Sequence, residues 1–253
     1  MSIILKNPHS ILAAIQARPK DVQEIVLPAG RQNEYWEQVR ALAAEKGVRI
    51  GTSGQKSTSF GKKKREPVVE HDAHRTSAAH AVIADRRPVD VGNLFSQSKD
   101  HPNGGALWLA LDCVQDPHNV GAIFRAAAFF GVKGIIVTED RAAPLSGVVY
   151  DVASGGMEEV PFAMETNLVR VLEKAKDSGV WVLGTSENAD QDLISAKNDR
   201  PWLLVLGNEE KGLRRLVSEK CDVLYKITPR GKVGSLNVSV AAGIAISHLT
   251  RSV

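Results

Sequence analysis

The sequence predicts an α/β protein whose larger part is built around a parallel sheet. Apolar runs with the length and continuity of strands buried on both faces recur along the second half of the chain. Helical patterns separate these runs, and strands that alternate with helices favour a parallel sheet covered on both sides. The strand-like runs are residues 106–114, 134–139, 180–185, 201–207 and 222–227, and the helical patterns are 119–132, 166–179, 212–221 and 234–249.

A small α/β unit is predicted ahead of this sheet. The stretch "NEYWEQVRALAAEKG" has the pattern of an amphipathic helix that begins after Asn33 and ends at Gly47. A polar, glycine-containing and basic segment at 53–67 has the composition of a loop. The elements expected in this unit are helices at 9–19 and 33–47 and strands at 24–30, 48–52 and 77–87.

The stretch "RRPVDVGNLFSQSKDHPNGG" between the two patterns is aperiodic. It holds Pro, Gly, Asn and Ser without the spacing of a helix or a strand, which indicates a linker. We therefore expect a first domain at 1–85, a linker at 86–105 and a second domain at 106–253.

Composition indicates an ordinary globular protein of the cytoplasm. The 253 residues are 43% hydrophobic and 24% charged, with a net charge of +3, which is too mild to identify a partner. Cys113 and Cys221 form no CxxC motif and no disulfide framework, so a reducing compartment is expected. The chain shows neither a signal-peptide pattern nor an uncharged apolar stretch of about 20 residues, so we expect no membrane partner.

Polar residues follow three of the predicted strands, where ligands bind in parallel sheets. After the first strand, Arg125 is the only charged residue between Pro117 and Lys133, on a helix that is apolar almost all round. This pattern predicts a buried guanidinium that needs a carboxylate or an anionic ligand. A structural ion pair, or an arginine that extends to the surface, is the alternative.

The other two strand ends carry a glycine with acidic residues and a polar helix start. Gly207 precedes "NEEKGL", where Glu209 can face a crevice, while Glu210 and Lys211 fit a solvated turn. The third strand end leads to "GSLNVSVAAGIAISHL", in which Ser235, Asn237 and Ser239 crowd the start of an apolar helix. One such residue is enough to cap a helix, so three suggest an additional role. Neither a dinucleotide-binding fingerprint nor a phosphate-binding loop motif occurs at these ends.

Three segments together resemble the motifs of the SpoU family. These are "NVGAIFR" with Asn119 and Arg125, "LVLGNEEKGL" with Glu209, and "ITPRGKVGSLNVSVA" with Ser235 and Asn237. The family comprises RNA ribose 2′-O-methyltransferases of the knotted SPOUT superfamily. Residues 1–85 resemble, more weakly, the small ribosomal-protein-like RNA-binding domain of the branch that methylates a guanosine in large-subunit (23S) rRNA.

The resemblance implies a fold, a cofactor and a set of site residues. It implies a SPOUT-type parallel sheet with a C-terminal deep trefoil knot, for which Ala241, Ala242, Gly243 and Ala245 are small enough to pack closely. It implies S-adenosyl-L-methionine as methyl donor, an RNA substrate and a homodimer. The residues implied are Thr185, Gly207, Ile227 and Leu236 for the cofactor, and Asn119, Arg125, Glu209, Ser235 and Asn237 for the catalytic pocket.

Other roles and functions remain open from the sequence. The substrate could be tRNA in place of rRNA, or the chain could be an RNA-binding homologue without activity. A serine hydrolase that uses Ser235 with His248 is disfavoured because the G-x-S-x-G elbow is absent. His118 is expected in a loop, and we assign no metal ligand. The resemblance implies that Arg125 positions a phosphate and the hydroxyl first and accepts a proton second, because a guanidinium holds its proton tightly and is a poor base.

Two further positions bear on RNA and cofactor contacts. The basic run Lys62, Lys63, Lys64 and Arg65 could contact RNA phosphates, with a solvated loop as the alternative. Arg230 departs from a common family pattern, in which an apolar residue follows the proline, so the loop contacts there are in doubt.

Overall fold

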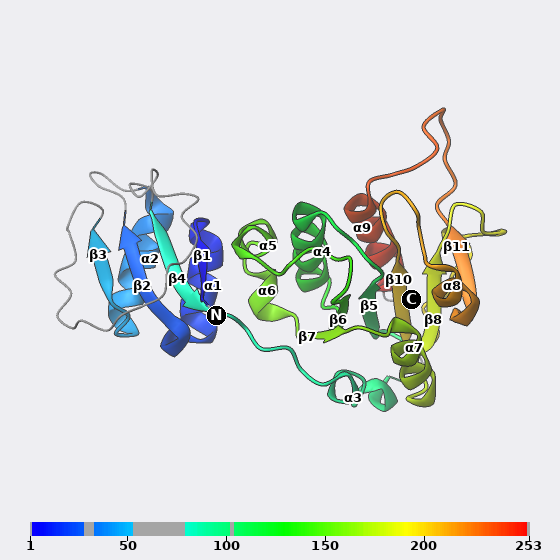
Figure 1. Ribbon diagram of the computed structural model, residues 1–253, viewed down its shortest axis with the longest axis horizontal. Coiled ribbons are helices and arrows are strands. Elements are labelled where there is room, and N and C mark those ends of the chain that lie inside the picture. Colours follow the sequence, from blue (N-terminus) through cyan, green and yellow to red (C-terminus); the bar gives the residue numbers. More distant parts are fainter. Residues whose placement is uncertain (1, 28–32, 53–78, 102–103, 252–253) are drawn as a thin grey trace. The chain divides into compact units, whose positions relative to one another are not determined.

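A computed structural model of the chain describes residues 2–27, 33–52, 79–101 and 104–251. The chain divides into two compact units, residues 1–85 and 86–253 (Figure 1). The segment with Lys62, Lys63, Lys64 and Arg65 lies outside the described residues.

The first unit is a four-stranded mixed sheet with two helices. Its strand order is β1-β4-β2-β3, with β4 antiparallel to β1 and β2, and β3 parallel to β2. The Asn33 side chain caps α2 by accepting the amide of Trp36 at 3.1 Å, as predicted. Strand β1 was missed because four residues are too few to show a period. The elements are β1 (Ser2–Leu5), α1 (Pro8–Ala17), β2 (Val22–Leu27), α2 (Glu34–Glu45), β3 (Ile50–Thr52) and β4 (His80–Ala84).

The second unit confirms the predicted parallel sheet. Its seven strands follow the order β7-β6-β5-β10-β8-β11-β9, and every pairing is parallel. Strands β5, β6 and β10 are buried at every position, which explains their continuous apolar sequences. Strands β7 and β9 are short and were not predicted. The bounds are β5 (Leu107–Leu111), β6 (Gly134–Thr138), β7 (Phe162–Glu165), β8 (Trp181–Thr185), β9 (Gln191–Asp192), β10 (Trp202–Leu206) and β11 (Val223–Lys226).

Helix α4 is the centre of a helical layer in the second unit, where it packs against α5, α6 and α9. Gly121 of α4 and Gly156 of α6 permit this packing, because a Cβ atom at either position would overlap the neighbouring helix. Helices α5 and α6 are short and were not predicted. The helices are α3 (Val91–Leu94), α4 (Pro117–Phe129), α5 (Gly147–Ala153), α6 (Gly156–Glu159), α7 (Leu168–Asp177), α8 (Arg215–Lys220) and α9 (Val238–Leu249).

The small residues of α9 take different positions. Ala242 and Ala245 are fully buried, as close packing requires. Gly243 instead faces open space, with no atom within 4 Å of the place where a Cβ would lie, and Ala241 lies beside a cavity. The buried face of this helix therefore includes Ala242 and Ala245 but not Gly243.

Residues 86–105 belong to the second unit. They contain α3, and Val91, Leu94 and Phe95 are buried in the same apolar core as Trp108 of β5. The Trp108 indole donates a hydrogen bond to the Leu94 carbonyl at 2.9 Å. Where composition indicates a linker, the structure has a segment that covers the sheet, because three apolar side chains among polar neighbours are enough to anchor it.

Both cysteines carry free thiols. Burial raises the pKa of the Cys221 thiol to about 12 and also raises that of Cys113, so both remain protonated at neutral pH. In the part of the chain that the structure describes, no helix combines the length and apolarity needed to cross a membrane.

Candidate functional site

The three polar strand ends meet in one hydrogen-bonded chain of side chains. Asn119, in the first turn of α4, is only 6% exposed, and its Nδ2 donates to Glu209 Oε1 at 3.0 Å. Asn237 Nδ2 donates to Asn119 Oδ1 at 2.9 Å. Because a carboxylate only accepts, Glu209 orients the Asn119 amide, and this amide in turn orients Asn237. Residues 90 and 118 positions apart are thus fixed relative to one another.

Glu209 also holds the start of α4. Its carboxylate accepts the backbone amides of Gln115 at 3.4 Å and Asp116 at 3.3 Å, and the Asn208 side chain at 3.2 Å. Negative charge at a helix N-terminus is favourable because the free amides there carry partial positive charge. Glu209 therefore connects the segment after β10 to the first turn of α4.

Asn237 has two roles, which explains the polar start of α9. Its Oδ1 accepts the amide of Ser239 at 2.8 Å and the Ser239 hydroxyl at 2.6 Å, so it caps the helix. Its Nδ2 remains available for Asn119. Ser235 lies before the helix and is exposed. The three polar residues thus divide between capping and the lining of a nearby cavity.

A cavity of about 680 Å³ lies beside this chain of side chains. Its lining includes five of the residues that the sequence assigned to cofactor or catalysis, namely Thr185, Glu209, Ile227, Ser235 and Leu236. Gly207 is buried behind this lining, and a Cβ atom there would overlap the backbone of Gly212. The glycine therefore permits a close approach of the 208–214 loop.

The predicted burial of Arg125 is wrong. Arg125 is exposed on α4, and no described residue forms a hydrogen bond or an ion pair with its guanidinium. Phe129, one turn later on the same face, is 82% exposed. Helices α5, α6 and α9 cover other faces of α4, so an almost wholly apolar sequence still leaves one face open. Arg125 does not line the cavity of its own chain.

The remaining candidates are less closely connected to the site. His118 lies in the first turn of α4, not in a loop, and is exposed. His248 bonds the Ala196 carbonyl at 2.9 Å from the last turn of α9. Ten helical residues separate Asn237 from His248, or roughly 15 Å along the axis, so Ser235 and His248 form no dyad. Arg230, Glu210 and Lys211 are exposed and line the cavity.

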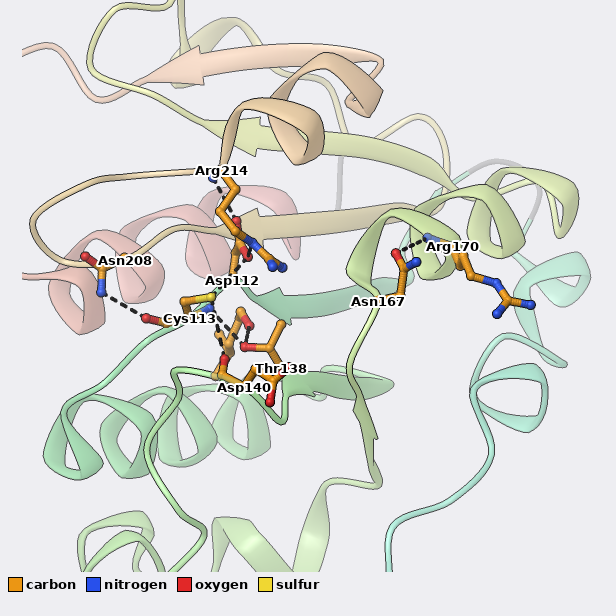
Figure 2. Close-up of polar contacts among 9 residues, drawn as sticks. Asp112, Cys113, Thr138, Asp140, Asn167, Arg170, Asn208 and Arg214 are labelled. Atoms are coloured by element: carbon orange, nitrogen blue, oxygen red, sulfur yellow. Dashed lines mark hydrogen bonds and ion pairs between the residues drawn. The ribbon is translucent and has the colours of Figure 1, made fainter.

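Two well-connected side chains at the same strand ends were missed from the sequence. Asp112 follows β5, is fully buried, and forms an ion pair with Arg214 at 2.6 Å (Figure 2). Asn208 donates to the carbonyl of Cys113 at 2.9 Å. A single acidic residue that ends an otherwise apolar run, as in "LWLALD", was the available signal, because a buried carboxylate requires a partner.

Comparison with known proteins agrees with this geometry. The SpoU rRNA Methylase family profile matches residues 106–247. A 23S rRNA (guanosine-2′-O-)-methyltransferase RlmB of Pseudomonas putida is 36% identical over 245 residues, covering 96% of this chain and 94% of the relative. The protein of the same name from Pseudomonas aeruginosa is 37% identical with the same coverage.

Among solved structures, the SpoU methyltransferase AviRb from Streptomyces viridochromogenes in complex with the cofactor AdoMet has a TM-score of 0.73 and 22% identity. The alignment covers 98% of this chain and 89% of the other. This likeness concerns the fold, a SPOUT-type methyltransferase with a mostly parallel α/β sheet. The family profile covers more than half of the chain, and the Pseudomonas relatives align with nearly all of it. The chain belongs to the SpoU rRNA methylase family.

Proposed function

We propose that this protein transfers a methyl group from S-adenosyl-L-methionine to the 2′-hydroxyl of a guanosine ribose in 23S rRNA. The observation that carries the proposal is the chain Glu209–Asn119–Asn237, which joins three family motifs beside a cavity of cofactor size. The relatives that match nearly the whole chain have names stating this activity.

The cavity suits S-adenosyl-L-methionine by size and by lining. Its volume of about 680 Å³ falls within the ~300–1,000 Å³ typical of small-molecule pockets. Ile227 and Leu236 offer apolar surface for an adenine ring, while Thr185 and Ser235 offer hydroxyls. Gly207 supports the wall from behind. Glu187 and Glu209 also line this space, and their negative charge complements the positive charge of a sulfonium.

When bound, the cofactor supplies an electrophilic methyl group, so the protein contributes mainly alignment. Asn119 and Asn237 have fixed amide orientations and can present polar atoms to a ribose in one arrangement. Glu209 already accepts several hydrogen bonds, which assigns it to holding Asn119. Arg125 offers several N–H donors in a fixed fork, and therefore positions a phosphate and the hydroxyl.

A homodimer accounts for the exposed position of Arg125. Apolar side chains are exposed on the helices α4, α5 and α9, including Phe129, Val148, Val240 and Ile244. A second copy that covers these side chains removes them from water and places Arg125 near an interface. In this arrangement Arg125 completes a site close to the boundary between two subunits.

The finer features of the family complete the proposal. We assign to α9 and its preceding loop the trefoil knot of SPOUT enzymes, and to residues 1–85 the binding of substrate RNA. Lys62, Lys63, Lys64 and Arg65 would contact phosphates there. Residues 106–253 carry the methyltransferase activity. An rRNA substrate and two free cysteines fit a cytoplasmic protein.

The test is transfer of labelled methyl groups to 23S rRNA that lacks modifications, followed by mapping of the product. We expect one methylated guanosine ribose, and no transfer when that nucleotide alone carries a 2′-deoxyribose. RNA affinity should fall little with the deoxy substrate, because phosphate contacts dominate binding. A methyl group found on the base would contradict the proposal. Transfer to tRNA alone would show that the substrate is tRNA and not 23S rRNA.

A further inference from the structure

The loop that carries Glu209 is attached at both of its ends to two consecutive residues. The 208–214 loop starts after Gly207 and ends where α8 begins at Arg215. Asn208 at its start and Arg214 at its end both bind residues 112–113, directly after β5 (Figure 2). We name these two attachments together the strand-end brace.

The first attachment is an ion pair with a buried carboxylate. Asp112 is fully buried, and its two carboxylate oxygens accept from Arg214, one from the backbone amide at 2.9 Å and one from Nε at 2.6 Å. The Arg214 side chain is 43% exposed. A buried carboxylate without a partner is strongly unfavourable, and a two-point charge-assisted contact fixes direction as well as distance. The two contacts therefore orient Arg214 relative to the end of β5.

The second attachment fixes the start of the loop. Asn208 Nδ2 donates to the Cys113 carbonyl at 2.9 Å, while Asn208 Oδ1 accepts the amides of Glu210 and Lys211, each at 3.1 Å. The backbones of Asn208 and Gly212 pair with each other at 3.0 and 2.9 Å. The loop is thus closed on itself as well as attached to β5.

The anchor point is itself held in place. Cys113 has a φ of 60°, a left-handed conformation that is costly for a residue with a side chain. Its amide donates to the Thr138 hydroxyl at 3.0 Å, and Thr138 is buried at the end of β6. In this conformation the Asp112 side chain binds Arg214, while the Cys113 carbonyl accepts a hydrogen bond from Asn208. The brace therefore connects three strands, β5, β6 and β10.

The brace controls the wall of the cavity and the position of Glu209. Residues 208–213 all line the cavity, and Glu209 holds Asn119. We infer that Asp112, Arg214 and Asn208 are positioning residues. They hold this wall and the Glu209 carboxylate in the positions that cofactor binding and methyl transfer require. The inference rests on the proposed function. Asp112 and Arg214 act through the loop, because neither lines the cavity, whereas Asn208 also belongs to the lining.

The test compares two neighbouring arginines in the full-length protein. Arg214→Ala removes the ion pair with the buried Asp112, whereas Arg215→Ala removes the surface pair with Glu219 within α8. Binding of S-adenosyl-L-methionine is measured by calorimetry, well below the unfolding temperature of each variant. We expect Arg214→Ala to weaken binding and lower kcat on the order of 10-fold to 100-fold, since a misplacement of about 1 Å can have this effect. Arg215→Ala should have the cofactor affinity and the kcat of the wild type.

Two further measurements separate positioning from general stability. Methylguanidinium at millimolar concentration should restore cofactor binding to Arg214→Ala in a saturable manner, because Arg214 borders an open cavity of about 480 Å³. Arg214→Lys keeps the charge but not the Nε geometry. Its cofactor affinity and kcat should lie between those of the wild type and Arg214→Ala, and this variant provides a test even if the alanine variant folds poorly. The losses of cofactor affinity caused by Asn208→Ala and Arg214→Ala should be less than additive in the double variant, because both substitutions release the same loop.

The outcomes distinguish this inference from the proposed function. A wild-type protein without affinity for S-adenosyl-L-methionine would overturn the function and, with it, the brace. A wild-type protein that binds, together with folded Arg214→Ala and Arg214→Lys variants of unchanged affinity and kcat, would overturn the brace alone. Equal losses in Arg214→Ala and Arg215→Ala would also overturn it, since the effect would then not depend on Asp112.

Discussion

Asparagine begins helices in both units, but Asn33 and Asn237 use their side chains differently. In the first unit Asn33 caps α2 through its side-chain oxygen, and no described residue accepts a hydrogen bond from its amide nitrogen. In the second unit Asn237 caps α9 in the same way, and its nitrogen also donates to Asn119. The same local cap therefore serves only its own helix at Asn33 and is joined to the candidate site at Asn237.

The distribution of buried polar groups shows the same difference. Among the described residues of the first unit, Ser10 is the only polar side chain in the buried class. The second unit buries Ser98, Asp112, Asn119 and Thr138, and the last three lie just after β5, in the first turn of α4 and at the end of β6. Because buried polar groups are unfavourable without partners, their concentration at one end of the sheet requires the network of contacts that surrounds the candidate site.

The largest effect is expected from Arg125→Ala in the second unit. Methyl transfer should fall by about 10²-fold to 10³-fold, the typical loss when a group that stabilises the transition state is removed. Cofactor affinity should stay within a few-fold, because Arg125 lies outside the cavity. Kinetics with 23S rRNA and calorimetry with S-adenosyl-L-methionine measure the two quantities. Wild-type turnover in a folded variant would show that the exposed arginine has no catalytic role.

A matched pair of substitutions tests the two asparagine caps directly. Asn237→Asp keeps the capping oxygen but loses the donor to Asn119 and adds a charge near Glu209, so turnover should fall about 10-fold to 100-fold. Asn33→Asp keeps its cap and should leave turnover unchanged. Thermal unfolding of both variants provides the control for stability. Equal losses of turnover in the two variants would contradict the different roles of the two asparagines.

Removal of residues 1–85 tests the division between the units. The remaining chain retains the cavity, so we expect its affinity for S-adenosyl-L-methionine to stay within a few-fold of wild type. Methylation of 23S rRNA should fall roughly 10-fold, because phosphate contacts of the missing unit no longer contribute to binding. A well-folded truncated protein that binds no cofactor would contradict this division.

The smallest effect is expected from reversing the charge of Lys62, Lys63, Lys64 and Arg65. Each lost phosphate contact should reduce the slope of log affinity against log salt by roughly 0.7–0.9. Filter binding to the rRNA fragment over a salt series measures this slope. Turnover at saturating RNA should remain unchanged, because the three motifs lie in the second unit. An unchanged slope would indicate that these four residues make no phosphate contacts and form an ordinary solvated loop.

The sequence by itself predicted the longer strands of the second unit, their parallel arrangement and the three segments of the candidate site. Strands β5, β6 and β10 are apolar at almost every position because both faces are covered, so their patterns are unambiguous. The site residues Asn119, Glu209 and Asn237 follow strands or begin helices, where polar groups are expected. Short elements such as β7 and α6 have too few residues to show a period, and the sequence missed them.

Only the tertiary structure decided which side chains meet and which face water. Arg125 was predicted to be buried because α4 is apolar almost all round, yet α5, α6 and α9 leave its face open. Asp112 binds Arg214 across 102 positions of sequence, and no local pattern encodes that partner. Hydrogen bonds between distant segments depend on how the strands are ordered in the sheet. This order places the ends of β5 and β10 side by side and thereby creates both the site and its brace.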